Sequence, residues 1–291
     1  MKKVNFTNTD KAKGTYYFKD GFTATSNITD KGTYHGTHVA GIVAANGPEV
    51  TGVAGPIDEV RILPIKALGD DGSGYTTAVM DAIKWAAGED PDKLTTKING
   101  HTLPSVQQNV KVINLSLGVS RQVGSNWNDM INTLCPVWDE AAEVANQNNV
   151  TIVVAAGNSN SPLYDNIPAV CKNLNIIIAQ ATGKDGKRSY YSAYFDPKVD
   201  GKLANRVVVS APGGDAIKDG VKQTILSTIG GNAYGYMQGT SMASPHVAGV
   251  ISLLYTYNPD SNFEKIKDAL EINSRTVINA KKVLTGQKTQ Q

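Results

Sequence analysis

Ser241 is the residue of this sequence whose type and neighbours most directly suggest covalent chemistry. It stands in the run GTSMASPHVAG, residues 239–249, where a long apolar segment with helical character begins. Free N–H groups and the dipole at a helix N-terminus favour a developing negative charge, so a serine hydroxyl there could act as a nucleophile. Gly239 permits a tight turn into the helix, and Pro245 falls early, where a missing N–H costs little. The alternative is a serine that only caps the helix.

His35 is the second candidate, at the start of the run HGTHVAGIVAA, residues 35–45. A histidine fixed by its own helix can serve as a general base if it reaches the nucleophile. His35 and His38 could instead form a metal pair, but the sequence offers no third ligand at a suitable spacing, so we predict no metal site. We expect His38 and His246 to be packed structural histidines.

Asn158 is the third candidate, in the run VVAAGNSN, residues 153–160. The run reads as a buried strand that leads into a turn of small residues. A side-chain amide in that position could donate a hydrogen bond to an oxyanion. The alternative is an ordinary asparagine in a turn, which is common because asparagine tolerates turn conformations.

The elements that would position these residues follow from the hydrophobic pattern. Near-continuous β-branched runs predict strands covered on both faces, as in a parallel sheet. Helical patterns lie between and after these runs, and the alternation predicts a three-layer α/β domain with a mostly parallel central sheet flanked by helices. The expected strands are residues 60–65, 110–115, 150–154, 174–178 and 207–209, and the expected helices are residues 76–87, 138–149, 241–257 and 263–270. Residues 93–108 lack periodicity and are expected to form a surface insertion.

Length and composition fit one domain. The 291 residues are 41% hydrophobic and show no linker, so we assign residues 1–286 to one domain and residues 287–291 to a polar tail. The net charge of +2 comes from interleaved acidic and basic residues, which gives no reason to expect nucleic acid or a membrane surface as a partner. No run of 18 apolar residues and no apolar signal region are present. The two cysteines, Cys135 and Cys171, could be free thiols or one disulfide.

Taken together, the three runs resemble the motifs of subtilisin-like serine proteases. The similarity extends from about residue 32 to 284 and includes SAPGG, residues 210–214, and VINA, residues 277–280. The resemblance implies a subtilisin-like fold and an endopeptidase that hydrolyses peptide bonds through an acyl-enzyme. It implies that Ser241 is the nucleophile, His35 the general base and Asn158 the oxyanion donor. The chemistry requires no cofactor. Structural calcium is common in the family, but the loop of residues 46–51 is too short to match its usual site, so we assign none.

The resemblance also implies where a peptide or protein substrate binds. In this family two loop edges present backbone to an extended peptide, which binds between them as an added strand. The matching residues here are Gly72, Ser73 and Gly74 on one edge and Ser116, Leu117 and Gly118 on the other. The second edge, with Ala155, Ala156 and Gly157, would line the first specificity pocket, and these small and apolar residues predict a roomy pocket for apolar side chains.

A disulfide is implied in the same way. Several secreted bacterial members have one cysteine early in the helix before the oxyanion strand and another in a Pro-Ala-x-Cys loop after it. Cys135 and the run PAVC, residues 168–171, match these positions. The resemblance therefore implies a Cys135–Cys171 disulfide, an oxidising and extracellular compartment, and a monomer.

The resemblance departs from the family at the third member of the triad. The family's aspartate ends an apolar strand well before the histidine and is followed by Ser/Thr-Gly, and no such strand precedes His35. Asp10, Asp20 and Asp30 stand among polar and turn residues, so we assign none of them as the triad acid. We expect an N-terminally truncated sequence. The alternative is an impaired or inactive peptide-binding protein, because loss of this carboxylate lowers turnover by about 10⁴. An unrelated α/β hydrolase is disfavoured because no Gly-x-Ser-x-Gly run surrounds Ser241.

Overall fold

The computed structural model describes residues 34–69, 71–96, 102–106, 109–171, 175–201, 206–271 and 277–286. It also describes the backbone of three short strands, β1 (Val4–Asn5), β2 (Tyr16–Tyr17) and β3 (Thr23–Ala24). The tail predicted at residues 287–291 and the aspartates Asp10, Asp20 and Asp30 lie outside the described residues.

The centre of the molecule is a four-stranded parallel sheet. Its strand order is β10 (Val207–Pro212), β9 (Ile176–Thr182), β7 (Thr151–Ala155) and β5 (Val112–Leu115). Side chains on both faces of β7 and β9 are buried and those of β5 and β10 are buried or half-buried, which explains why these strands read as near-continuous apolar runs. Four of the five strands predicted from sequence are therefore confirmed, with ends shifted by a few residues.

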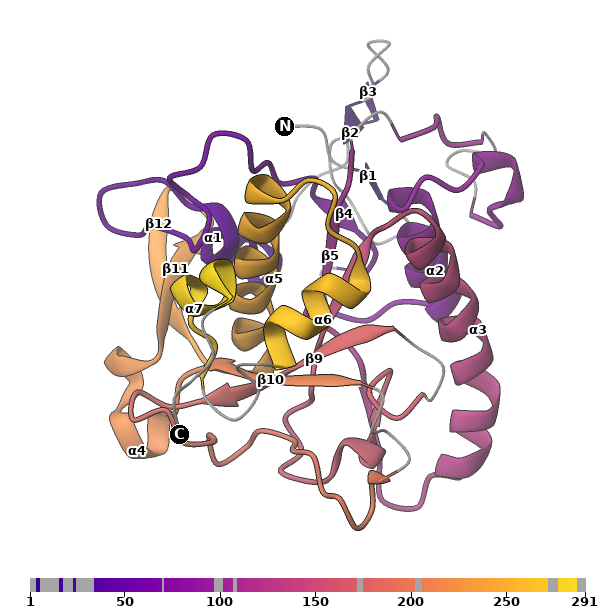
Figure 1. The fold of residues 1–291 in the computed structure, drawn as a ribbon. Coiled ribbons are helices and arrows are strands. Elements are labelled where there is room, and N and C mark those ends of the chain that lie inside the picture. The colour runs from indigo at the N-terminus through magenta and orange to yellow at the C-terminus, as the bar shows by residue number, and fades with distance from the viewer. Residues whose placement is uncertain are drawn as a thin grey trace.

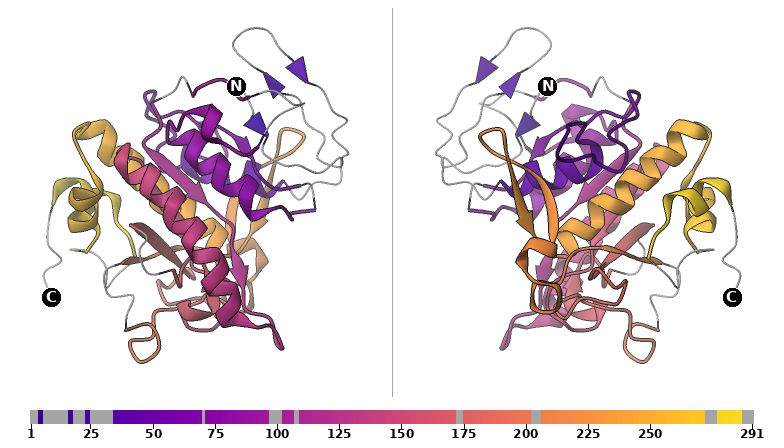
Figure 2. Two further views of the ribbon diagram at one scale, coloured as in Figure 1. Left: turned by 90° about the vertical axis from the view of Figure 1, so that its right-hand side faces the viewer. Right: turned by 90° about the vertical axis from the view of Figure 1, so that its left-hand side faces the viewer.

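Helices cover both faces of this sheet, as Figures 1 and 2 show. Helices α2 (Thr76–Ala86) and α3 (Trp127–Gln147) enclose one core with alternate residues of the strands, such as Ile152 and Val154. On the other face α5 (Thr240–Tyr257), α6 (Phe263–Glu271) and α7 (Ala280–Thr285) enclose a second core with Val153 and Ile177. The result is the three-layer α/β architecture predicted from the sequence.

Helix α1 (His35–Ala44) lies beside α5 and is covered by an antiparallel hairpin of β11 (Ile225–Ile229) and β12 (Ala233–Met237). Short elements complete the chain. They are the parallel pair of β1 and β4 (Ile65–Lys66), the antiparallel pairs β2–β3 and β6 (Val119–Ser120)–β8 (Asn166–Ile167), helix α4 (Ala216–Asp219) and the 3₁₀ turns Pro91–Lys93, Leu163–Asp165 and Val221–Gln223. None of the helices described is long and apolar enough to cross a membrane.

The strand predicted at residues 60–65 is wrong for most of its length. Only Ile65 pairs, as part of β4, and residues 60–64 form no ladder. Pro64 has no N–H to donate, and side chains along this stretch are only partly buried, so pairing gains little there.

Helix α3 is longer than predicted at its N-terminus, because the pattern beginning at Trp138 continues back to Trp127 through Pro136. An internal proline removes one helical hydrogen bond, which is why the segment before it reads as non-helical. Burial of Trp127, Cys135 and Trp138 against the sheet offsets that loss.

The insertion predicted at residues 93–108 is partly packed. Leu94 and Leu103 are buried against α2, and Trp85 Nε1 donates to Pro104 O (2.8 Å). The expectation of a purely surface segment is therefore wrong for its described part, because two isolated leucines suffice to anchor it without any periodic pattern.

Candidate active site

Ser241 lies in the first turn of α5 and does not cap it. The N-cap is Gly239, whose φ of 150° lies in a region that favours glycine, and the helix begins at Thr240. The capping alternative for Ser241 is therefore wrong. Its half-buried side chain directs Oγ toward Ser116 O (3.3 Å), and its own N–H is one of the unpaired donors of a helix start.

Hydrogen bonds fix the end of β5 to this first turn. Ser116 Oγ donates to Ser241 O (2.7 Å) and accepts from Asn114 Nδ2 (3.0 Å). Ser244 Oγ donates to Asn114 Oδ1 (2.6 Å). The edge of Ser116, Leu117 and Gly118 is thereby held beside Ser241, although 125 positions separate the two serines in sequence.

Asn158 is bound to the same turn through its carboxamide oxygen. Oδ1 accepts from Thr240 N (2.9 Å) and from Thr240 Oγ1 (3.0 Å), and Gly157 N donates to Thr240 Oγ1 (3.1 Å). The Nδ2 group is the end of this exposed side chain that can donate. An ideal Cβ placed on Gly239 would lie 3.6 Å from both Asn158 Nδ2 and Ser241 N and 3.8 Å from Asn158 Oδ1, so two donors lie near one point at the start of α5. Such a pair can bind a developing oxyanion.

His35 is the first residue of α1 and is half-buried. Burial, and secondarily the charge of His38, hold the pKa of His35 below its usual value of 6.5. The pKa of His246, on α5 shortly after Ser241, is lowered by burial and also by His38. His38 thus influences the pKa of a histidine on each helix, in line with the packing of α1 against α5.

His38 packs as a structural side chain. It is fully buried, and its Nε2 lies 3.0 Å from both Ile225 O and Gly235 O of the β11–β12 hairpin. Ser227 Oγ donates to His38 O (2.7 Å), so the hairpin is hydrogen-bonded to both the side chain and the backbone of His38. Across the described part of the chain, His, Cys, Asp and Glu side chains form no group of three arranged to hold a metal.

The other predicted substrate edge is an exposed turn. Ser73 N and Oγ donate to Asp71 Oδ1 (2.9 and 2.8 Å), and Gly69 N donates to Ser73 O (2.7 Å). Gly72 has a φ of 79°, which this turn requires. The hydrogen bonds that Ser73 makes with described residues stay inside the turn, so they do not join Gly72, Ser73 and Gly74 to the Ser241 cluster.

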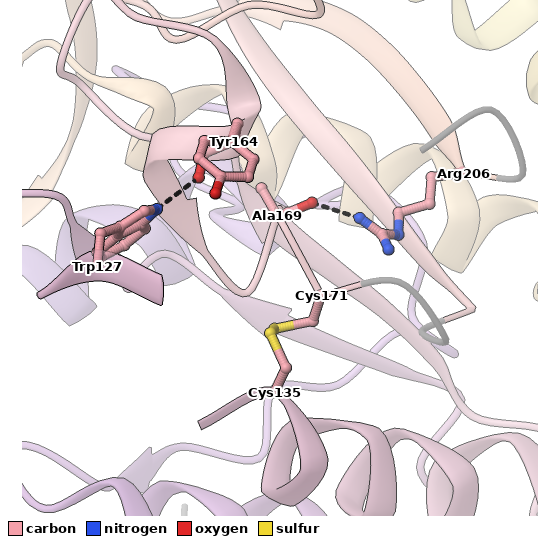
Figure 3. The surroundings of a disulfide bond; sticks show 6 residues. All are labelled: Trp127, Cys135, Tyr164, Ala169, Cys171 and Arg206. Atoms are coloured by element: carbon pink, nitrogen blue, oxygen red, sulfur yellow. Dashed lines mark hydrogen bonds between the residues drawn. A yellow bond between two sulfur atoms is a disulfide. The ribbon is translucent and has the colours of Figure 1, made fainter. Parts of the chain in front are cut away.

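Cys135 and Cys171 form a disulfide, as the resemblance implied. It ties α3 to the segment that carries β8 (Figure 3). Two further contacts hold the same segment, since Trp127 Nε1 donates to Tyr164 O (2.9 Å) and Arg206 Nη1 donates to Ala169 O.

Sequence reasoning missed two residues of this region. Thr240 bonds both Gly157 and Asn158, and Asn166 of β8 lies directly against Gly157. Thr240 stood inside the motif of Ser241. Nothing in the local sequence singled out Asn166, which follows Asp165 in the mixed run SPLYDNIP, residues 161–168.

Comparisons with known proteins identify the family of this chain. The sequence pattern of the Subtilase family matches residues 1–288. An extracellular protease of Xanthomonas campestris is 35% identical over 227 residues, which are 78% of this chain and 33% of that protein. A thermophilic serine proteinase of Bacillus sp. is 34% identical over 81% of this chain and 46% of its own length. The chain thus spans between a third and a half of these two relatives.

Solved structures show the same fold. A protease of Pseudoalteromonas arctica superposes with a TM-score of 0.63 at 28% identity, covering 90% of this chain and 73% of that one. The nisin leader peptidase of Lactococcus lactis gives a TM-score of 0.69 over 99% of this chain and 81% of its own, and at 21% identity it supports the fold alone. From its sequence, its fold and these matches, the chain belongs to the subtilase family, the subtilisin-like serine proteases.

Proposed function

We propose that this chain is a serine endopeptidase that hydrolyses peptide bonds through an acyl-enzyme on Ser241. The observation that carries the proposal is the pair of donors, Asn158 Nδ2 and Ser241 N, that lie near each other at the start of α5, where Ser241 Oγ is also placed. A serine hydroxyl beside such a pair is suited to attack a carbonyl whose oxygen becomes negative. The relatives named as proteases support the same reaction class.

His35 is the proposed general base. Because its pKa is lowered, the imidazole is neutral and able to accept a proton at neutral pH. It takes the proton of Ser241 Oγ as the carbonyl is attacked, and it returns that proton to the leaving amine. Water then attacks the acyl group by the same route and regenerates Ser241. The substrate backbone would bind along Ser116, Leu117 and Gly118, and along Gly72, Ser73 and Gly74.

Covalent labelling with a fluorophosphonate tests the proposal directly. We expect one adduct per chain, located on Ser241 by peptide mass spectrometry, and none in Ser241→Ala. Ser252→Ala is a matched control, because Ser252 lies on the same helix and its Oγ donates only within it, to Ala248 O (2.9 Å). Failure of the folded, unmutated protein to react contradicts the proposal.

A non-catalytic peptide-binding protein is the second candidate, because the aspartates between residue 1 and His35, which are Asp10, Asp20 and Asp30, stand among polar and turn residues and none is assigned as the triad acid. In that case the folded protein binds peptides but does not react with the fluorophosphonate.

We further propose an extracellular location, supported by the Cys135–Cys171 disulfide and by the extracellular relatives.

A further inference from the structure

The two proposed oxyanion donors stand on different segments of the chain. Asn158 follows β7, and Ser241 N belongs to the first turn of α5, which begins after the N-cap Gly239. The bonds between Asn158 Oδ1 and Thr240 join the two segments on one side. A pair of donors binds an oxyanion well only when their separation is fixed, so any second connection between these segments bears on catalysis.

Tyr191 supplies a second connection. Its carbonyl accepts from Asn160 N (2.8 Å), two residues after Asn158, and Asn160 closes the turn with a left-handed φ of 50°. Its phenol oxygen lies 2.8 Å from Gly213 O and 2.7 Å from Gly214 O and donates its proton to this pair. One residue therefore holds the turn of Asn158 with its backbone and the residues after β10 with its side chain.

The carbonyl of Gly213 extends this connection to the segment of the nucleophile. Gly213 O also accepts from Gly239 N (3.0 Å), and an ideal Cβ on Gly213 would lie 2.8 Å from Gly239 O, so the two glycines are in direct contact. Gly239 is the N-cap of α5 and stands two residues before Ser241. The hydroxyl of Tyr191 and the N–H of Gly239 thus share one acceptor, so a shift of Gly213 displaces the start of α5.

Tyr191 is itself fixed in place. It is only 7% exposed, and its ring packs edge-on against Tyr190 with 5.2 Å between the ring centroids. Burial raises the pKa of Tyr191 to about 12, so the hydroxyl stays protonated and able to donate at neutral pH and well above it. Two residues later, Ala193 N donates to Gly157 O (2.9 Å), which holds the segment of Tyr191 against the turn after β7.

Arg188 holds the exposed side of the same segment. Its Nη1 donates to Ser192 O (2.6 Å) and to Asn160 Oδ1 (2.9 Å). The guanidinium lies over the ring of Tyr194, 4.6 Å from its centroid, which restricts the side chain to this position. Arg188 therefore ties the segment of Tyr191 to the turn after β7 by contacts that lie nearer to solvent.

We infer that Tyr191 is a positioning residue of the oxyanion site, and that its hydroxyl and carbonyl fix the separation between Asn158 Nδ2 and Ser241 N. The inference rests on the proposed function and adds a residue to its machinery. Tyr191 acts through neighbouring backbone groups and does not need to touch the substrate. Loss of its hydroxyl removes one of the two bonds described for Gly213 O and lets the two donor segments shift, which weakens transition-state binding more than substrate binding.

Tyr191→Phe tests the inference, because it removes the hydroxyl and keeps the ring. We expect kcat on a peptide substrate to fall about 10-fold with KM within ~2-fold of its unmutated value, a smaller loss than the removal of an oxyanion donor itself causes. A peptide boronate, which forms a tetrahedral adduct with the hydroxyl of Ser241, should bind about 10-fold more weakly to the variant. A product-like peptide should bind equally to both proteins, whereas damage to the substrate cleft would weaken both ligands.

Tyr255→Phe is the matched control. Tyr255 is also buried, with 6% exposed, and lies in the last turn of α5, away from Ser241. Its hydroxyl lies 2.9 Å from Thr151 Oγ1 and donates to Asn149 O (3.2 Å). Both tyrosine variants lose a buried hydrogen bond, so both should have a lower thermal midpoint. Only Tyr191→Phe should lower kcat.

Two more variants show whether Tyr191 acts through the donor pair. In an Asn158→Asp background the side-chain donor is already gone, so Tyr191→Phe should lower kcat by less than ~3-fold. Arg188→Met removes the exposed side-chain bonds of the same segment and should lower kcat with KM unchanged. It keeps the inference testable if Tyr191→Phe does not fold.

The inference is overturned by a folded Tyr191→Phe protein that retains its kcat, by an equal fall in kcat for Tyr255→Phe, or by fully multiplicative effects of Tyr191→Phe and Asn158→Asp. If Tyr191→Phe does not fold, an Arg188→Met protein with unchanged kcat overturns it. Failure of the proposed function is a distinct result, because the folded, unmutated protein then does not react with the fluorophosphonate at Ser241, and the inference fails with it.

Discussion

At the scale of single residues, the site depends on how one carboxamide is shared. Asn158 Oδ1 accepts hydrogen bonds from Thr240, and Asn158 Nδ2 remains able to donate a hydrogen bond. Thr240 Oγ1 in turn joins Asn158 to Gly157 N. A substitution can therefore remove the N–H donor of Asn158 and keep the hydrogen bond between its side-chain oxygen and Thr240 N.

Asn158→Asp makes that separation, because it keeps an oxygen for Thr240 N but loses the N–H group that we propose donates to the oxyanion. We expect kcat on a peptide substrate to fall by about 10²–10³ with little change in KM, the loss measured when such a donor is removed from a subtilisin. The thermal midpoint should stay close to that of the unmutated protein. A variant with undiminished kcat would show that Asn158 is not an oxyanion donor.

The residues of this site differ in how far the sequence could predict them. Ser241, His35 and Asn158 stand inside contiguous runs that resemble family motifs, so short segments carry the information. The bonds from Ser116 to Ser241 and the contact of Asn166 with Gly157 join different segments of the chain. Such contacts arise from the register of strands and helices in three dimensions, which a local pattern does not contain.

At the scale of elements, α3 shows a related limit. The pattern after Pro136 predicted a helix correctly, while the turns before it depend on burial of Trp127 and Cys135 against distant segments. The strands of the central sheet were predictable because burial on both faces makes them continuously apolar. The Cys135–Cys171 disulfide is the strongest single link between α3 and the segment of β8.

Removal of this disulfide in a Cys135→Ala/Cys171→Ala double variant should lower the free energy of unfolding. The bond closes a loop with a sequence separation of 36, for which the chain-entropy relation gives about 3–4 kcal/mol. Urea unfolding of both proteins without reductant measures the difference. Unmutated protein unfolded with reductant present should match the variant, and equal midpoints of the oxidised protein and the variant would contradict the prediction.

At the scale of the whole molecule, three histidines at the junction of α1 and α5 connect stability to pH. Burial is the main cause that lowers the pKa of His35, His38 and His246 in the folded state below 6.5. Below about pH 6.5 the unfolded chain therefore binds more protons than the folded one, so acidification favours unfolding.

We expect the free energy of unfolding to decrease as the pH falls from 7 to 5.5, a range above the titration of most carboxylates. Urea unfolding at several pH values measures the slope. His246→Gln keeps an N–H group for Met242 O, which His246 Nδ1 bonds at 2.8 Å, and should reduce the slope. Stability that is constant or rises on acidification would show that these histidines do not control it.

Helix α5 also has a consequence for resistance to proteolytic digestion. It contacts all four strands of the central sheet as well as α1 and α7, and nearly all of its turns are buried. A peptidase must bind several residues of its target in extended form, which α5 can adopt only after its contacts with every one of these elements are broken. Cleavage of α5 by a peptidase therefore requires global unfolding, while nicks in native molecules are expected in exposed loops such as residues 71–75.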